Sequence, residues 1–157
     1  MGLSEELGFP RRLINEDHEA LLGVLVTAEI LKKESTRLFA PLGITGAQFN
    51  VLILLYAQTE DGTMSQSDLG RLLTVHRSNV TGLVDRLEAQ GLVRRQDDQK
   101  DRRVYRVALT DLGRETACRA EELYLSRIHG IMSVLEPREW RALSSTLGKI
   151  RTRVRKD

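Results

Sequence analysis

The sequence predicts a mainly helical chain that carries one small β-hairpin, and three observations support this fold class. Apolar residues recur at helical spacing over most of the chain, including both ends. Between Ser65 and Leu109, two short helical patterns are followed by two extended runs rich in Val, Tyr and Leu. Aromatic residues make up only 4% of the 157 residues, so the core must be largely aliphatic.

The stretch from Ser65 to Leu109 organises the rest of the chain. Its two helices are marked by apolar residues on one stripe each: Leu69, Leu72 and Leu73, then Val80, Leu83, Val84 and Leu87. Gly91 is expected to stop the second helix in a left-handed conformation. Leu92 to Gln96 and Arg103 to Leu109 are then expected to be strands. Two helices, a turn and a hairpin form a winged helix-turn-helix, a shape that mostly binds nucleic acid.

A further helix is expected before this motif, from Leu42 to Ala57. Thr45 and Gln48 fit a capping box at its start, and Ser65 and Asp68 repeat the pattern at the next helix. Four side chains should face inward: Phe49, Leu52, Ile53 and Tyr56. Gln58 to Thr63 is expected to be a loop.

Long helices are expected at both ends of the chain. Asp17 to about Phe39 would be about 35 Å long, more than a small winged helix can cover. Leu112 to Leu135 and Pro137 to Val154 offer a matching surface, with Pro137 at a first helical position and Glu136 as a poor N-cap. The expected organisation is an N-terminal dimerisation helix region (1–40), a winged helix-turn-helix DNA-binding domain (41–110) and C-terminal dimerisation helices (111–157). The alternative packs these helices within one chain.

Positive charge collects in the central motif. The net charge is only +2, but residues 71–106 carry nine basic and five acidic side chains, whereas residues 1–40 carry five basic and seven acidic ones. This distribution favours contact of the motif with a polyanion.

The second helix of the motif is expected to read DNA bases. Only its N-terminal end can enter a major groove, and its apolar stripe faces the core. The candidate base contacts are Arg77, Ser78, Asn79, Thr81 and Gly82. Arg can grip guanine and Asn adenine in bidentate fashion, each contact giving roughly 1 to 3 kcal/mol of discrimination. Gly82 costs the helix about 1 kcal/mol relative to alanine, which indicates a close approach of backbone to DNA.

Phosphate contacts are expected on both sides of this helix. The free N–H groups at the start of the preceding helix suit an anion, and Arg94 and Arg95 add charge at the base of the wing. The residues at that helix start are Ser65, Gln66 and Ser67. The charged tip of the hairpin is a candidate DNA contact, and its alternative is a solvated loop.

Enzyme, metal and membrane classes find no support in the sequence. It lacks the nucleotide-binding glycine loops, the H-E-x-x-H motif and a Cys pair for zinc. His18, His76 and His129 are far apart, so no metal site and no cofactor are expected. The single cysteine, Cys118, is expected to be a buried, inert thiol. The N-terminus has no apolar run long enough for secretion or a membrane, so a cytoplasmic protein is expected.

The chain resembles the multiple antibiotic resistance regulator (MarR) family of bacterial transcription factors. The matching segments are Leu42 to Leu52, SQSDLGRLL, HRSNVTGLVDRLEAQGLVRR, the wing pair Asp101 and Arg103, and Val107 to Arg114. In the family, the wing arginine reaches the minor groove and the aspartate orients it. The resemblance therefore assigns those roles to Arg103 and Asp101, and Arg102 is a rival for the first. The resemblance also offers an alternative explanation of Gly82, namely that the glycine is simply inherited within the family.

The resemblance implies a homodimer that regulates transcription, as a repressor by family habit, from a pseudo-palindromic double-stranded site. Its half-sites would lie about one helical turn, roughly 34 Å, apart. Many family members bind small aromatic acids between the dimer platform and the winged helix, which implies a small aromatic effector here. The candidate lining residues are Phe39, Phe49, Tyr56 and Met132. Core packing explains each equally well, so no ligand site is assigned. The alternative function is a winged helix that contacts another protein, or one that acts as a DNA-structural protein without preferring any sequence.

Overall fold

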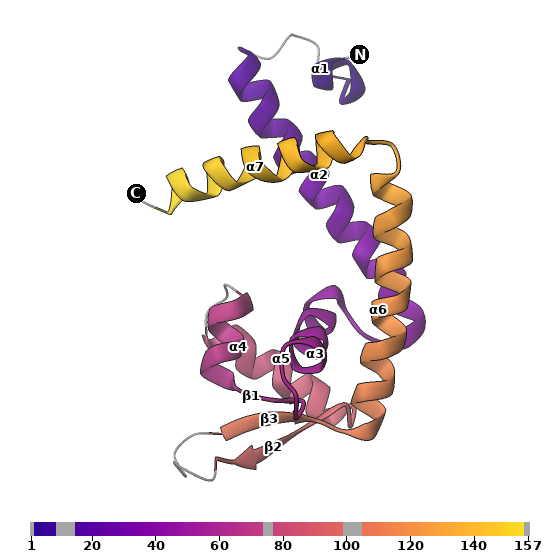
Figure 1. Cartoon of the computed structure of the whole chain (residues 1–157), viewed down its shortest axis with the longest axis vertical. Helices are drawn as coiled ribbons and strands as arrows, with labels where there is room; N and C mark the ends of the chain where they lie inside the picture. The colour runs from indigo at the N-terminus through magenta and orange to yellow at the C-terminus, as the bar shows by residue number, and fades with distance from the viewer. Residues whose placement is uncertain (1, 9–14, 74–76, 99–104, 156–157) are drawn as a thin grey trace. The chain divides into compact units, whose positions relative to one another are not determined.

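A computed structural model describes residues 2–8, 15–73, 77–98 and 105–155. The chain forms two compact units, Met1–Cys118 and Arg119–Asp157, and helix α6 runs through the boundary between them. Figure 1 shows the elements of each unit. In chain order these are α1 (Leu3–Glu6), α2 (Glu16–Phe39), the 3-10 helix η1 (Ala40–Leu42), α3 (Gly46–Ala57), β1 (Thr63–Ser65), α4 (Gln66–Leu73), α5 (Arg77–Ala89), β2 (Val93–Asp97), β3 (Tyr105–Leu109), α6 (Asp111–Met132) and α7 (Pro137–Val154).

The predicted fold class is confirmed: the described residues form helices and one small antiparallel sheet. In this sheet β3 is the central strand, with β1 on one side and β2 on the other. The β2–β3 hairpin pairs Val93 with Leu109 at its base and Asp97 with Tyr105 at its outer end. Both strands lie close to the predicted ranges. Arg103 and Val104, also expected in the second strand, lie outside the described residues.

Strand β1 corrects the expectation of a loop up to Thr63. Thr63 pairs with Ala108 and Ser65 with Arg106, so this short segment completes the sheet just before α4 begins. Three residues are too few to show an alternation of apolar and polar side chains, and the pattern is therefore absent from the sequence. Thr63 and Met64 are both buried.

The core of the first unit is aliphatic and lies between the helices and the sheet. As predicted, the stripe on α5 faces this core: Val80, Val84 and Leu87 are fully buried and Leu83 is half-buried. On α4, Leu69 is buried but Leu72 is 49% exposed, so only part of the predicted stripe contributes to the core. The residues of α3 that are buried in this core are Phe49, Val51, Leu52 and Leu55.

Helix α3 begins four residues later than predicted. Gly43 has φ 67° and ends the 3-10 helix η1, so the chain cannot continue as a helix from Leu42. Thr45 then caps the new helix as predicted: its Oγ1 accepts from the Gln48 amide at 3.2 Å. In return the Gln48 Oε1 accepts from the Thr45 amide at 2.9 Å.

Helix α2 is anchored at its C-terminal end. Phe39 is 1% exposed and stacks on Phe49 of α3, with 4.4 Å between ring centroids. Several apolar side chains further along α2 are exposed: Leu21, Val24, Leu25, Ile30 and Leu31. The short helix α1 was not expected from the sequence. The Leu3 amide donates to Glu19 Oε1 at 2.6 Å, which ties α1 to α2.

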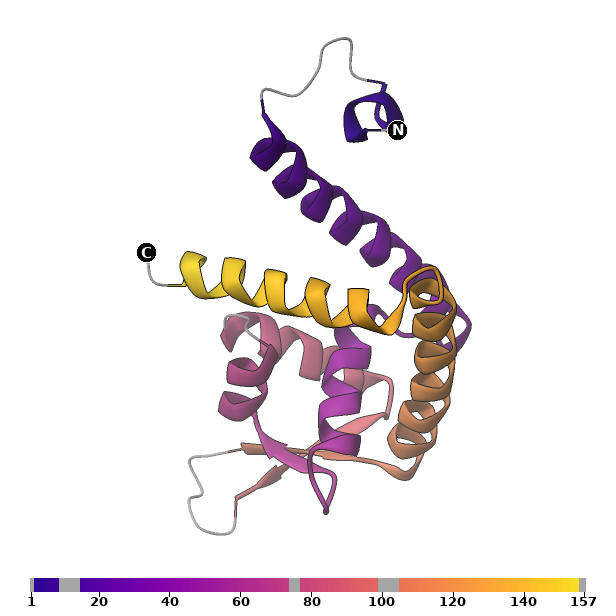
Figure 2. The same ribbon diagram turned by 45° about the horizontal axis from the view of Figure 1, so that its top comes forward.

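The second unit consists of the later part of α6 and helix α7, which Figure 2 shows as two successive helices. Helix α7 has the predicted bounds and begins at Pro137, while α6 ends at Met132, three residues before the predicted end. Trp140 Nε1 donates to the Met132 carbonyl at 2.9 Å and so joins the two helices across their turn. Glu136 makes no side-chain cap bond, as expected of a poor N-cap, and Glu139 Oε2 accepts from its amide at 2.7 Å.

Candidate nucleic-acid interface

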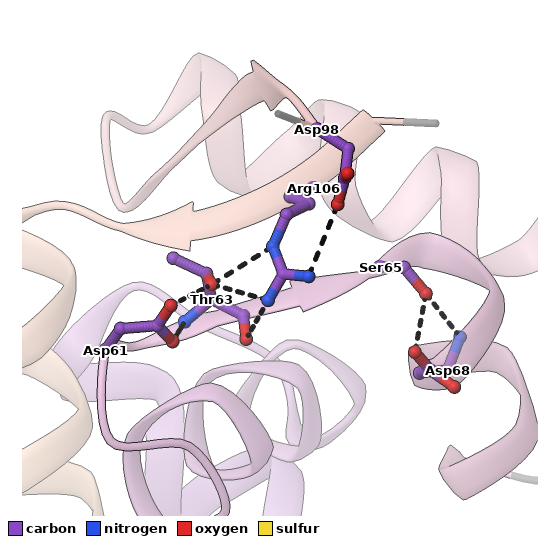
Figure 3. A network of polar contacts seen from close by, with 6 residues as sticks. All are labelled: Asp61, Thr63, Ser65, Asp68, Asp98 and Arg106. Atoms are coloured by element: carbon purple, nitrogen blue, oxygen red, sulfur yellow. Dashed lines mark hydrogen bonds and ion pairs between the residues drawn. The ribbon is translucent and has the colours of Figure 1, made fainter. Parts of the chain in front are cut away.

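The start of α4 is fixed by a reciprocal pair of hydrogen bonds, shown in Figure 3. The Asp68 amide donates to Ser65 Oγ at 3.1 Å, and that hydroxyl donates to Asp68 Oδ2 at 2.8 Å. The Ser65 hydroxyl lowers the pKa of Asp68, and Arg71, 2.9 Å away, lowers it further. The predicted capping box is therefore present only in part: Ser65 Oγ caps the Asp68 amide, but the Asp68 carboxylate accepts from the Ser65 hydroxyl rather than from the Ser65 backbone amide. Ser65 therefore uses its side chain within the helix cap, while Ser67 is exposed and Gln66 half-buried.

Helix α5 turns polar side chains away from its buried stripe. Asn79 and Thr81 are exposed on either side of the fully buried Val80, and Val84, one turn later, is also fully buried. This is the arrangement that a helix needs if its N-terminal end is to contact bases. The backbones of Arg77 and Ser78 belong to α5, whereas their side chains lie outside what the structure describes.

Gly82 leaves room beside α5. A Cβ added there would have only Arg86 Nη2 nearby, at 3.7 Å. Arg86 is exposed and folds back along the helix, where its Nε donates to the Gly82 carbonyl at 2.9 Å. Among the described residues, nothing therefore requires glycine at this position.

Arg95 and Arg94 have different surroundings although they are neighbours on β2. The guanidinium of Arg95 forms ion pairs with Asp85 and Glu88 of α5, and its amide donates to Glu88 Oε1 at 2.8 Å. Burial alone would lower the pKa of Arg95, but the hydrogen bonds that its guanidinium donates to Asp85 and Glu88 outweigh burial and raise the pKa above its usual value. Arg94 is exposed. Of the two predicted phosphate contacts at the wing base, Arg94 is therefore exposed, whereas Arg95 is engaged with α5.

A second arginine on the wing, Arg106 of β3, is also engaged internally (Figure 3). Its guanidinium donates to Thr63 Oγ1 from Nη2 at 2.8 Å and from Nε at 3.2 Å, and to the Thr63 carbonyl at 3.3 Å. Nη1 lies 3.5 Å from Asp98 Oδ2. The Thr63 hydroxyl in turn donates to Asp61 Oδ2 at 2.7 Å and lowers the pKa of that carboxyl. In the sequence, Arg106 is recognisable only as one of the positive charges of the motif.

The corner between α5 and the wing is tied to the start of α6. Thr110 Oγ1 accepts from the Gly113 amide at 2.9 Å and lies 2.7 Å from the Gly91 carbonyl, to which it donates. Gly91 has φ 70°, the left-handed conformation predicted for it. Gly113 is buried against the Leu92 carbonyl. The segment Val107 to Arg114 therefore holds the end of α5, the wing and α6 together.

The three predicted wing-tip residues, Asp101, Arg102 and Arg103, lie outside the described residues. Their assignment to the minor groove remains a prediction.

The aromatic residues considered for a ligand site are in part accounted for by the core. Phe39 and Phe49 are buried and stacked on each other, and Tyr56 is half-buried. Met132 belongs to the second unit.

Cys118 is half-buried rather than fully buried, because Ala117 and Ala120 occupy the buried face of α6. Among the residues that the structure describes, no group of His, Cys, Asp and Glu side chains could hold a metal ion. Within the same residues, no single helix has the length and apolar composition to cross a membrane. One pair passes only together, with a 71° bend between Glu16–Leu42 and Gly46–Ala57.

Comparisons with known proteins agree on the class of the chain. The MarR family model matches residues 42–104. A transcriptional activatory protein, BadR of Rhodopseudomonas palustris, is 41% identical over 87 residues, which are 55% of this chain and 50% of BadR. The chain thus spans about half the length of this curated relative. The named relatives are transcriptional regulators rather than enzymes.

Solved structures show the same fold. AbsC, a MarR family transcriptional regulator from Streptomyces coelicolor, has a TM-score of 0.84 at 23% identity, covering 94% of this chain and all of AbsC. MepR of S. aureus, solved in complex with DNA, has a TM-score of 0.76 at 24% identity, covering 85% of this chain and 96% of MepR.

Proposed function

Because the chain belongs to the MarR family of transcriptional regulators, we propose that it binds a pseudo-palindromic site on double-stranded DNA as a homodimer. Helix α5 lies in the major groove, α4 and the wing base contact phosphates, and the wing tip reaches the minor groove. A two-fold symmetric dimer matches a site with two half-sites about one helical turn, roughly 34 Å, apart.

The observation that carries this proposal is the two-sided character of α5. Its buried stripe packs on the core, and Asn79 and Thr81 are exposed near its N-terminal end. A surface for a protein partner would expose apolar side chains at this position, because the centre of such an interface is apolar. The exposed polar residues favour base edges as the partner, with Arg77, Ser78 and Gly82 completing the predicted reading set.

Phosphate binding is supported by the start of α4 and by Arg94. The first turn of α4 carries Gln66 and the exposed Ser67, whose amides lie at the positive end of the helix. Arg94 is exposed on β2, and its guanidinium makes no ion pair with any residue in the part of the chain that the structure describes. In contrast, Arg95 is engaged with Asp85 and Glu88, so we assign it to holding the wing base against α5.

Dimerisation is supported by apolar side chains that each unit leaves exposed. Leu25 on α2 is 57% exposed and Leu125 on α6 is 58% exposed. A second copy of the chain would bury such residues, and each fully buried leucine contributes about 1.5 to 3 kcal/mol. The other members of this set on α6 and α7 are Leu112, Leu123, Tyr124, Ile128, Trp140, Leu143, Ile150 and Val154. Analytical ultracentrifugation should therefore find a dimer, and a stable monomer at micromolar concentration would contradict this part of the proposal.

The sign of regulation and its effector complete the proposal. We propose repression, by the habit of the family, although the relative BadR is named as an activatory protein. We also propose that a small aromatic acid releases the DNA by favouring a spacing of the two α5 helices that misfits the site. Transcription measured in vitro from a promoter that carries a selected site, with and without the protein, shows directly whether the protein represses or activates.

The decisive experiment is selection of binding sites from random duplexes with the purified protein, repeated with small aromatic acids present. The expected result is a two-fold symmetric sequence with two half-sites. Asn79→Ala should relax the preference at one base pair in each half-site, because it removes a bidentate contact worth roughly 1 to 3 kcal/mol. Asn50→Ala is the matched control, since Asn50 is exposed on α3. Selection that returns no preferred sequence would favour the protein-contact or DNA-structural alternative.

A further inference from the structure

A single side chain joins three segments of the chain beside the wing. Arg106 lies on the central strand β3, paired with Ser65 of β1 on one side and with Gln96 of β2 on the other. Its guanidinium extends to Thr63, two residues before Ser65, and also approaches Asp98, which follows β2. Figure 3 shows the guanidinium between these partners. Arg106 therefore contacts both the strand that leads into α4 and the end of the wing strand β2.

The Thr63 hydroxyl is fully used in this arrangement. A hydroxyl has one hydrogen to donate and two lone pairs to accept with. Thr63 Oγ1 donates to Asp61 at 2.7 Å and accepts from Nε and Nη2 of Arg106. The Thr63 amide also donates to Asp61 Oδ1, at 2.9 Å. The loop before β1 is thus fixed to the wing through a chain of hydrogen bonds rather than through one exposed ion pair.

The partial burial of the group strengthens it. The side chains of Arg106 and Asp98 are 34% and 19% exposed, so water screens their interaction less than it screens a fully exposed pair. The pKa of Asp68 at the cap of α4 is lowered mainly by the Ser65 hydroxyl and then by Arg71, and the positive charge of Arg106 makes a smaller contribution in the same direction. The electrostatic effect of Arg106 therefore extends to the helix start at which phosphate contacts are expected.

We propose that Arg106 is a positioning residue that fixes the wing relative to the start of α4. The minor-groove contact of the wing and the phosphate contacts of α4 then meet DNA in one register. This inference rests on the proposed function. Because the guanidinium is committed to Thr63 and Asp98, Arg106 acts through the protein and not on DNA. Its planar fork makes three hydrogen bonds to Thr63 at once, which the ammonium of a lysine cannot reproduce.

The first test uses Arg106→Gln and Arg106→Lys on the selected duplex. Both variants should weaken binding about tenfold, the loss expected of one good contact. A phosphate ligand would behave differently, because lysine serves equally well as a point charge. Wild-type affinity in Arg106→Lys would therefore overturn the proposal. Arg119→Gln removes the same charge from an exposed site on α6 and should bind within about twofold of wild type.

A double-mutant cycle separates positioning from a general loss of stability. In the Arg103→Ala background, where the predicted wing contact is already absent, Arg106→Gln should weaken binding by less than about twofold. A variant that merely unfolds part of the protein would lose the same factor in both backgrounds, and that result would contradict the proposal.

Amide hydrogen exchange of the free protein provides a readout that does not depend on DNA. Arg106→Gln should speed exchange at the amides of β1 and at the outer ends of β2 and β3, while α3 exchanges as in wild type. Unchanged exchange in the strands would overturn the role of Arg106. If the strands respond but wild-type protein prefers no duplex, the proposed DNA binding fails and the anchoring of the wing stands.

Discussion

The carbonyl oxygen of Leu92 lies so close to Gly113 that a Cβ added to the glycine would be 1.8 Å from it. No side chain can occupy that space, so the backbone at the base of the wing packs directly against the first turn of α6. The contact explains why glycine follows Thr110 by three residues: the same turn is held by Thr110 Oγ1, which accepts from the Gly113 amide.

Gly113→Ala should therefore lower the free energy of unfolding by about 3 kcal/mol, at the upper end of the cost of overpacking a core. Gly130→Ala is the matched control on the same helix, because no atom of the described residues lies within 4 Å of a Cβ at that position. It should raise stability by about 0.5 to 1 kcal/mol through helix propensity. Urea unfolding of both variants checks this pair, and a neutral Gly113→Ala would show that the contact with Leu92 yields easily.

Gly82→Ala should separate folding from DNA binding. Among the described residues, the added Cβ meets only Arg86 Nη2, at 3.7 Å, so the variant should gain up to about 1 kcal/mol of stability from helix propensity. If the backbone of α5 approaches DNA closely, the same methyl group should weaken binding to the selected duplex. A stabilised variant with wild-type affinity would leave inheritance as the explanation of this glycine.

Arg94→Gln and Arg95→Gln should have opposite signatures. Arg94 is exposed, and its loss should reduce the slope of log K against log salt by about one with little change in stability. Arg95 pairs with Asp85 and Glu88, so its loss should cost about 1 kcal/mol of stability and leave the salt slope intact. Salt titrations of DNA binding, together with denaturant unfolding, measure both quantities. A reduced slope in Arg95→Gln would restore it as a phosphate contact.

The cap of α4 should make stability depend on pH in the acid range. Hydrogen bonding from Ser65 lowers the pKa of Asp68 below its ordinary value of 3.8. A carboxyl whose pKa is lower in the folded state adds stability above its unfolded pKa and loses it as pH falls through the folded pKa. Unfolding from about pH 5 downward should thus show stability falling below about pH 4.

Ser65→Ala should flatten this dependence and cost about 1 kcal/mol at neutral pH, the usual value of an N-cap. Ser67→Ala, which alters an exposed neighbour, provides the control. If Ser65→Ala loses stability at acid pH just as the wild type does, another carboxyl, such as Asp61 beside Thr63, dominates the pH dependence.

Arg103→Ala should weaken binding to all sequences and lower the salt slope by about one, because a wing arginine in the minor groove replaces counterions without reading a unique base pattern. Arg102→Ala is the paired variant. If Arg102→Ala weakens binding and lowers the salt slope while Arg103→Ala does not, Arg102 rather than Arg103 makes the minor-groove contact.

The parts of the fold that the sequence predicts well are those with a repeating pattern. The stripe on α5 repeats every three to four residues over four positions, and the structure buries three of them completely. The capping box at Thr45 follows from local chemistry and is complete, and at Ser65 the side chain caps the Asp68 amide as predicted. Strand β1 has no such signal, because its three residues are defined only by their pairing with a strand more than forty residues later.

The candidate site is harder to predict, because a sequence does not show which partner a charged side chain will find. Arg94 and Arg95 are adjacent and chemically identical, yet only Arg95 meets two carboxylates from α5. Arg106 looks like one more positive charge, and its partner Thr63 belongs to a segment expected to be a loop. Both cases depend on sheet register, which is set by long-range pairing.

The ring stack of Phe39 on Phe49 has a mechanical consequence. It anchors one end of α2, whose 24 residues extend about 36 Å, while much of the helix remains uncovered within its own unit. A tilt of about 5° at this joint would displace the far tip by about 3 Å over that length. A slight repacking of these two aromatic rings would therefore move the far end of α2 by about the diameter of an atom.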